Sequence, residues 1–207
     1  MTDLNRKAHW ETVYRTKGEN EVSWFQENPA PSLELIEFAR PTSQSAIVDI
    51  GGGASRLVDT LVAHGFTNVT VLDLSEAALA SAKARLGDSG QSVHWVIADV
   101  TRWYPAQTYD IWHDRAAFHF LIEPSDRDAY VARLKQAMKP GGHAIIGTFA
   151  LDGPEKCSGL PVNRYDAASL GAALGGGFEL VEARWHEHTT PWNSVQRFQF
   201  CVFRRST

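Results

Sequence analysis

Residues 46–58 read AIVDIGGGASRLV, and this stretch decides the fold of the chain. A short apolar run ends in Asp49, three glycines follow, and an amphipathic segment begins after Ser55. Such a short run, rich in β-branched residues, is typical of a buried parallel strand. Glycines permit a turn with positive φ and leave bare backbone against which a ligand can lie. The helix that follows has free N–H groups at its start. The stretch therefore predicts a strand, a tight turn and a helix that together suit a bound ligand.

Two forms of glycine turn match part of this pattern. A dinucleotide-binding turn reads G-x-G-x-x-G, and its third glycine packs the helix against the strand. Gly51 and Gly53 match, but Arg56 stands in the third place, which argues against NAD. The other form, D-x-G-x-G, is matched by residues 49–53. It resembles motif I of the class I S-adenosylmethionine-dependent methyltransferases.

The rest of the chain alternates between strand and helix patterns. Short apolar runs predict strands at 69–73, 93–99, 109–114, 143–149, 178–188 and 195–204. Helical patterns occupy 55–64, 75–86, 126–138 and 166–174, and a tight turn is predicted at 139–142. The last two strands have no helix between them, so one of them is antiparallel and closes the sheet.

This order predicts an α/β fold with a doubly wound, mostly parallel sheet, the last strand antiparallel, and helices on both faces. Counted with the opening strand, the seven strands resemble the seven-stranded methyltransferase fold over essentially the whole chain. The 207 residues suggest one domain. Residues 1 to about 40 carry helical patterns and predict a helical lid in front of the sheet.

Composition restricts the classes of partner. The net charge is −4 without a basic tract, which does not suit general nucleic-acid binding. No apolar run reaches the roughly 18 residues of a membrane span. The first residues are polar and do not resemble a signal peptide, and Cys157 and Cys201 are too few for a disulfide framework. We therefore expect a cytoplasmic protein that uses neither membrane nor nucleic acid.

Four predicted strands end in an aspartate, and the carboxyl ends of parallel strands form the ligand-binding edge of such a sheet. These residues are Asp49, Asp73, Asp99 and Asp114. Asp73 lies about 20 residues after the glycines, the usual place of a ribose-binding acid. The resemblance implies that Asp73 accepts from the ribose, Asp99 from the adenine amino group, and that Asp49 orders the turn and the methionyl end. Each acid has an alternative role as a cap or turn residue.

A second, more specific resemblance involves both ends of the predicted site. Residues 114–121, DRAAFHFL, partly match the D-K-G-T-x-D-x-[IL] stretch of a protein-lysine methyltransferase subfamily. Members also carry [FY]-W-[DE]-x-x-Y, and Trp10, Glu11 and Tyr14 match that motif. His119 stands where the subfamily has an acid, which suggests a proton acceptor; a structural histidine is the alternative.

Residues 21–26 predict a lid over the site, in which Trp24 either packs on the cofactor or fastens the N-terminal helix to the sheet. The predicted catalytic residues are Asp114 and His119. The predicted cofactor-binding residues are Trp24, Asp49, Gly51, Gly52, Gly53, Asp73, Leu74, Asp99, Val100 and Asp114. His186 and His188 alternate along one strand without a third ligand at a suitable spacing, so no metal site is expected.

The sequence thus predicts in-line transfer of a methyl group from S-adenosylmethionine. A protein lysine is one acceptor, and a small thiol, amine or hydroxyl compound is the alternative. A different class of function, a non-catalytic nucleotide-binding module or an NAD-dependent oxidoreductase, is less consistent with Arg56 in the glycine turn.

Overall fold

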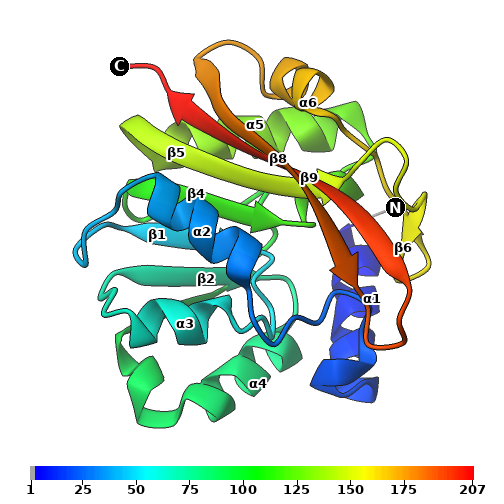
Figure 1. The fold of residues 1–207 in the computed structure, drawn as a ribbon. Coiled ribbons are helices and arrows are strands. Elements are labelled where there is room, and N and C mark those ends of the chain that lie inside the picture. The colour runs from blue at the N-terminus through cyan, green and yellow to red at the C-terminus, as the bar shows by residue number, and fades with distance from the viewer. Residues whose placement is uncertain (1–2) are drawn as a thin grey trace.

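Seven strands form one sheet in the order β3-β2-β1-β4-β5-β9-β8 in the computed structural model, which describes residues 3–207 (Figure 1). Their bounds are β1 Ile47–Ile50, β2 Val69–Asp73, β3 His94–Ile97, β4 Tyr109–Arg115, β5 Met138–Phe149, β8 Phe178–Thr189 and β9 Val195–Arg205. Strands β1 to β5 are parallel, and β9 is antiparallel to both of its neighbours. The predicted sheet is confirmed, although the antiparallel strand lies between β5 and β8 rather than at the edge.

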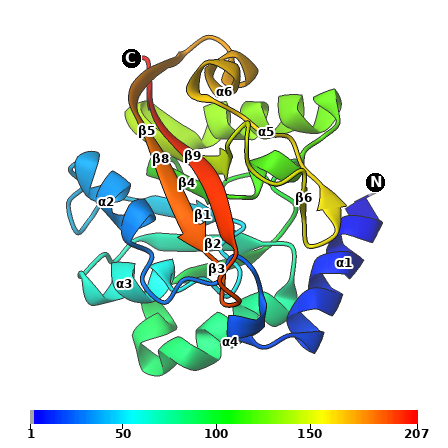
Figure 2. The same cartoon turned by 45° about the vertical axis from the view of Figure 1, so that its right-hand side comes forward.

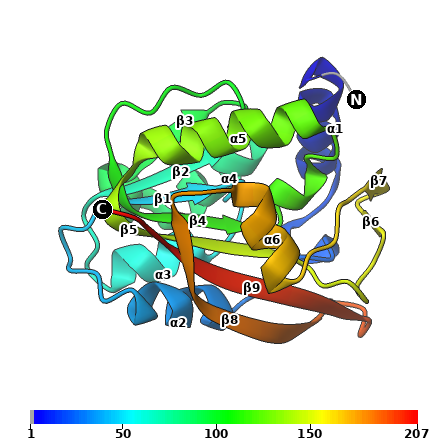
Figure 3. The same ribbon diagram turned by 90° about the horizontal axis from the view of Figure 1, so that it is seen from above.

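Helices cover both faces of the sheet, as Figure 3 shows from above. On one face are α2 Ala30–Phe38, α3 Leu57–Ala63 and α4 Glu76–Leu86; on the other are α5 Pro124–Ala137 and α6 Ala167–Leu174. Successive strand residues point to opposite faces. Val48 therefore packs in the core with α5, whereas Ile47 packs in the core with α2. Burial on both faces explains the nearly continuous apolar runs of these strands.

Helix α1, Asp3–Thr16, belongs to neither layer and stands beside the carboxyl ends of the parallel strands (Figures 1 and 2). Glu11 on this helix accepts a hydrogen bond from Ser75 Oγ (2.8 Å), at the start of α4. Arg6 Nη2 lies 3.1 Å from Asp99 Oδ2, just after β3. Two polar contacts thus fasten the helix over the edge at which we expect the site.

Two connections differ from the predicted pattern. Strand β5 begins at Met138, and residues 139–142, predicted as a turn, bulge from the ladder opposite Asp110 with φ +78° at Gly141. The loop after β5 contains a short hairpin, β6 Lys156–Cys157 and β7 Leu160–Pro161, which lies near α1 in both side views (Figures 1 and 2). Within residues 3–207 no helix has the length and apolar character needed to cross a bilayer.

Candidate active site

Two cavities meet at the carboxyl ends of the strands. The strand-end cavity, about 820 Å³, has Asp73, Asp99 and Phe120 among its walls. The turn cavity, about 780 Å³, lies on the other side of the glycine turn and has Asp49 and His113 among its walls. Four residues line both cavities: Tyr14, Trp24, Gly51 and Arg115. The two cavities therefore adjoin one another around the turn.

The glycine turn fits closely against its surroundings. Gly53 has φ +49°, and a Cβ there would come within 2.8 Å of Tyr14 Oη and 3.1 Å of Asp73 Oδ2. Gly51 has φ +65°, and a Cβ there would come within 2.8 Å of Ala117 Cβ. Both positions require glycine for conformation and for space. The backbone of the turn can consequently lie directly against a ligand flanked by a hydroxyl and a carboxylate.

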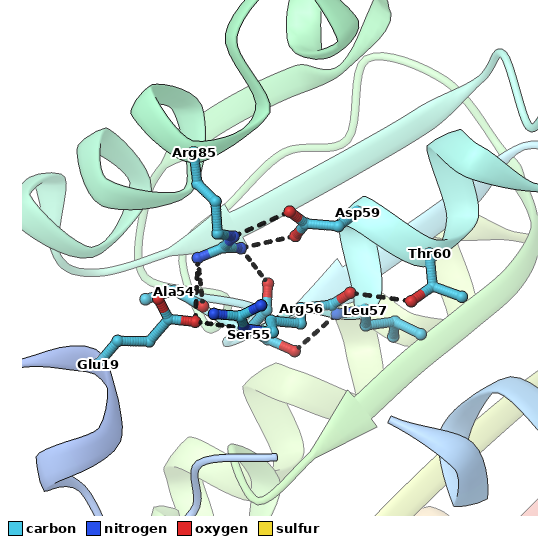
Figure 4. A network of polar contacts seen from close by, with 8 residues as sticks. All are labelled: Glu19, Ala54, Ser55, Arg56, Leu57, Asp59, Thr60 and Arg85. Carbon is cyan, nitrogen blue, oxygen red and sulfur yellow. Dashed lines mark hydrogen bonds and ion pairs between the residues drawn. The ribbon is translucent and has the colours of Figure 1, made fainter. Parts of the chain in front are cut away.

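Figure 4 shows how the chain after the turn is held in place. Arg85 on α4 binds both carboxylate oxygens of Asp59 on α3, with distances of 2.8 and 2.6 Å. It also donates to the carbonyl oxygens of Ala54 (3.1 Å) and Ser55 (2.9 Å). A bidentate arginine–carboxylate pair fixes geometry as well as charge. One guanidinium therefore ties the loop that leaves the glycine turn to two helices.

Arg56, which occupies the place of the third dinucleotide glycine, also has a defined role. Its Nε donates to Glu19 Oε1 at 2.8 Å (Figure 4). Its guanidinium also lies 5.7 Å from the centre of the Phe25 ring. Arg56 thus connects the glycine loop to the N-terminal segment that covers it.

Beneath the turn, Asp49 and His113 form a buried pair from neighbouring strands. The register of β1 and β4 places them side by side, and His113 Nδ1 donates to Asp49 Oδ1 at 2.7 Å. A Cβ on Gly52 would come within 2.6 Å of Asp49 Oδ2, so the same carboxylate supports the turn. His113 Nε2 is buried without a hydrogen-bond partner in the described chain. No three His, Cys, Asp or Glu side chains in residues 3–207 are grouped so as to hold a metal ion.

Asp73 is the predicted ribose-binding acid, and it lines the strand-end cavity. Its Oδ1 accepts from Ser75 N at 2.8 Å. Burial raises the pKa of Asp73 to about 7, with a smaller contribution from the nearby charge of Asp49. A ligand that donates hydrogen bonds to this carboxylate would offset the cost of its burial.

Asp99 stands further along the same cavity, next to Val100. Its Oδ1 accepts from the backbone N and the hydroxyl of Thr101, at 2.9 and 2.7 Å. Its Oδ2 faces Arg6. The predicted cofactor residues that line one or both cavities are Trp24, Asp49, Gly51, Gly52, Asp73, Leu74, Asp99 and Val100.

Asp114 and His119 depart from the expected placement, because neither lines a cavity. Asp114 points to the α5 face, where it accepts from Tyr130 Oη (2.7 Å) and from the backbone N of Ala117 (2.8 Å) and Phe118. Burial raises its pKa to about 6. His119 is fully buried, packs against the ring of Phe149 at 4.9 Å, and has a pKa lowered by burial to about 3. Their contacts organise the segment after β4.

The alternation of side chains along β4 explains this departure. Residues 112 and 114 face α5, so residues 113 and 115 face the opposite side, toward Asp49 and the cavities. Sequence analysis matched Arg115 to a motif position but gave neither His113 nor Arg115 a role in the site. A strict period of two along 109–115 is the signal that would have identified them.

Aromatic side chains form one wall of the strand-end cavity. Trp10 packs edge-on against Trp24 (5.6 Å between ring centres) and Phe120 (5.0 Å), and Tyr14 lies 6.2 Å from Trp24. Trp24 therefore both fastens α1 and lines the site. Its carbonyl oxygen accepts from Arg115 Nη1 at 3.0 Å, which anchors the segment to β4.

Comparison with known proteins agrees with this architecture. A family model described as a methyltransferase domain matches residues 47–142, which span the glycine turn, Asp73 and Asp99. A ubiquinone biosynthesis O-methyltransferase of Aromatoleum aromaticum is 30% identical over 179 residues, 84% of this chain and 67% of that protein. The EEF1A lysine methyltransferase 2 of Danio rerio is 28% identical over 160 residues, 69% of this chain and 68% of that protein.

Solved structures share the fold at low sequence identity. The 1,6-didemethyltoxoflavin-N1-methyltransferase of Burkholderia thailandensis, solved with S-adenosylhomocysteine, has a TM-score of 0.77 at 19% identity, over 99% of this chain and 88% of that one. The N-methyltransferase NodS of Bradyrhizobium japonicum has a TM-score of 0.73 at 16% identity, over 96% of this chain and 99% of that one. With the relatives in sequence, these findings establish that the chain belongs to the class I S-adenosylmethionine-dependent methyltransferases.

Proposed function

We propose that this methyltransferase acts on a small molecule that binds in the strand-end cavity, between the aromatic wall and the end of β4. The observation that carries the proposal is the character of that cavity. Its walls on the β4 side are apolar or cationic, with Trp10, Trp24, Phe120, Cys157 and Arg115. Its acids, Asp73 and Asp99, both lie on the other side, after β2 and β3.

The cofactor occupies the acidic side in this proposal. Asp73 accepts from the ribose hydroxyls, with Leu74 beside it, and Asp99 with Val100 meets the adenine. The backbone of Gly51, Gly52 and Gly53 lies along the methionyl part, supported from below by Asp49. The fit is supported by the buried Asp73 carboxylate, which lines the strand-end cavity, and by Gly51 and Gly52, whose bare backbone lines the site at the turn. Residues 3–38 provide the lid, with Trp24 at its centre.

S-adenosylmethionine, when bound, supplies a methyl group that is already electrophilic. The chain must therefore hold the acceptor in line and exclude water, rather than activate the donor. The aromatic wall of Trp10, Trp24 and Phe120 excludes water from the acceptor side. We assign no contact with the reactants to Asp114 or His119, because both lie outside the cavities.

A protein lysine is the second candidate acceptor, favoured by the relative that methylates an EEF1A lysine and by the W-E-x-x-Y motif. In this chain, however, the residues of this motif make contacts on the side of the site where we place the cofactor. Glu11 binds the start of α4, and Tyr14 covers Gly53. A lysine ammonium would require carboxylates on the acceptor side, and the described walls of the strand-end cavity place none there. We therefore favour the small molecule.

We also propose that the protein acts in the cytoplasm, without a nucleic acid or membrane as partner. Both cysteines are free and buried, which suits a reducing cytoplasm. The net charge of −4 suits neither a nucleic acid nor an anionic surface as partner.

Radiolabelled methyl transfer tests the proposal. Wild-type protein is incubated with methyl-tritiated S-adenosylmethionine and either a panel of aromatic thiols, phenols and amines or purified EEF1A. We expect label in at least one small molecule and none in the protein. Transfer to EEF1A with none to the panel would overturn the choice of acceptor. The Asp73→Ala variant, which loses the proposed ribose ligand, should transfer no label to either.

A further inference from the structure

Arg115 is a half-buried cation, and one edge of its guanidinium has no hydrogen-bond partner within the described chain. It is the last residue of β4, and it lines both cavities. Its Nη1 donates to the carbonyl oxygen of Trp24 at 3.0 Å. Its Nε and Nη2 are buried and make no hydrogen bond within the described chain. The guanidinium also lies 5.5 Å from the centre of the Phe198 ring on β9, which fixes its plane.

No carboxylate of the described chain forms an ion pair with Arg115, although the charge of nearby Asp49 favours its charged form. Asp49 is engaged by His113 Nδ1 at 2.7 Å and by the glycine turn above it. Burial raises the pKa of the Cys157 thiol to about 11 and raises the pKa of Tyr14 above its ordinary value, so both are neutral near pH 7. Burial lowers the pKa of Arg115 to about 10, which leaves it charged at that pH. Buried guanidinium nitrogens without a hydrogen-bonded counter-charge are unfavourable unless a ligand supplies one.

The two unpartnered nitrogens lie on one edge of the guanidinium. Nε–H and Nη2–H point in the same direction and form the fork that binds both oxygens of a carboxylate. The opposite edge is already held by Trp24. Arg115 thus presents a free edge with two donors, which a lysine at this position could not provide.

The position of this edge separates it from the cofactor side of the site. In the sheet, β4 lies between β1 and β5, whereas Asp73 and Asp99 follow β2 and β3. Lys17 and Arg56 line the turn cavity near the glycine turn, where the cofactor's own carboxylate lies in our proposed function. Arg115 also lines the turn cavity, but unlike Lys17 and Arg56 it shares the strand-end cavity with Phe120 and Cys157 on the acceptor side.

We propose that the methyl acceptor carries a carboxylate and that Arg115 binds this carboxylate through Nε and Nη2. Arg115 is then a specificity-determining residue, which selects apolar acids over neutral compounds of the same shape. This inference rests on the proposed function and refines its class of substrate. Because both nitrogens are shielded from bulk water, Trp24 or another neighbour must move when the acid binds.

Ligand selectivity in the presence of product cofactor tests this assignment. The probes are benzoate and the isosteric neutral benzamide, titrated by calorimetry against protein saturated with S-adenosylhomocysteine. For wild type we expect benzoate to bind at least tenfold more tightly than benzamide. Arg115→Met should abolish that preference, and Arg115→Lys, which keeps the charge but loses the fork, should retain only part of it.

Two further measurements distinguish the possible failures. Arg204→Met removes an exposed arginine on β9 and should leave the preference intact. The affinity for S-adenosylhomocysteine, measured by calorimetry, should change less than threefold in Arg115→Met. A loss of more than tenfold would assign Arg115 to the cofactor's carboxylate and overturn the inference, as would equal binding of the two probes by wild type. Failure of wild type to bind S-adenosylhomocysteine would instead overturn the proposed cofactor site.

Discussion

Replacement of Asp73 by asparagine should stabilise the ligand-free protein at alkaline pH while it removes cofactor binding. The Asp73 carboxyl group is buried, and its pKa is raised to about 7 from an ordinary value near 4. A carboxyl group that binds its proton more tightly in the folded chain makes the protein more stable as pH falls between these two values. Above pH 7 the ionised carboxylate therefore lowers the free energy of unfolding of the wild type, and this effect is absent from Asp73→Asn.

The size of this effect on the free energy of unfolding is set by a pH interval. Within that interval the Asp73 carboxyl group is protonated in the folded chain and ionised in the unfolded chain. Each pH unit in this interval changes the free energy of unfolding by about 1.4 kcal/mol. Between pH 5 and pH 8 only about two such units are crossed, because the folded group is ionised above pH 7. The difference in unfolding free energy between Asp73→Asn and wild type should consequently shift by about 3 kcal/mol in favour of the variant.

Urea unfolding at pH 5, 6, 7 and 8 measures this difference. Asp128→Asn removes an exposed carboxylate and serves as the matched control, with no expected change across the series. A difference between Asp73→Asn and wild type that stays constant from pH 5 to pH 8 would refute the reasoning about burial. In the same preparations the affinity for S-adenosylhomocysteine should fall about 10- to 100-fold, because hydrogen bonds to a charged acceptor are lost. Unchanged affinity would refute the ribose-binding role.

Three other substitutions test the supports of the site. Asp114→Asn should lower the unfolding free energy by about 2–4 kcal/mol in urea titrations, because an amide donor would face the Tyr130 hydroxyl that now donates to the carboxylate; an unchanged value would contradict the structural role. Glu11→Ala should cost about 1 kcal/mol, as loss of a helix cap does, and should weaken S-adenosylhomocysteine binding several-fold in calorimetry; full affinity would separate α1 from the cofactor site. Arg85→Met should cost about 2 kcal/mol and raise hydrogen exchange in residues 54–56, since it releases two carbonyl oxygens and Asp59; unaltered exchange would count against the network in Figure 4.

The fold was accessible to sequence analysis because its signals are local. The inner strands β1 and β2 are buried on both faces and are therefore mostly apolar, and helices are set off by turn or capping residues such as Gly65 and Ser75. The order of these signals restricts the topology to very few arrangements. The position of β9 between β5 and β8 was not accessible, because two strands joined by a hairpin can add to a sheet in either order.

The residues of the site likewise fall into those that local sequence patterns predict and those that depend on the tertiary structure. Glycines that require positive φ and acids that end strands are properties of short segments, so the sequence predicted Gly51, Gly53, Asp73 and Asp99. Of these, Gly51, Asp73 and Asp99 line the strand-end cavity, whereas Gly53 packs against Tyr14 and Asp73 and lines neither cavity. Asp114 was assigned to the reactants because it also ends a strand, although the pleat of β4 turns its side chain toward α5. Strand alternation decides between the two faces, and a shift of one residue exchanges them.

The sequence by itself therefore determined a doubly wound sheet with a glycine turn at its carboxyl edge, since these features depend on patterns within a few neighbouring residues. Only the tertiary structure decided that Asp49 pairs with His113, that α1 closes the edge through Arg6 and Glu11, and that Arg115 keeps a free guanidinium edge. Each of these facts joins segments that are far apart in the chain or compares one face of a strand with the other. Charge partners and burial are properties of the packed molecule, and no local pattern encodes them.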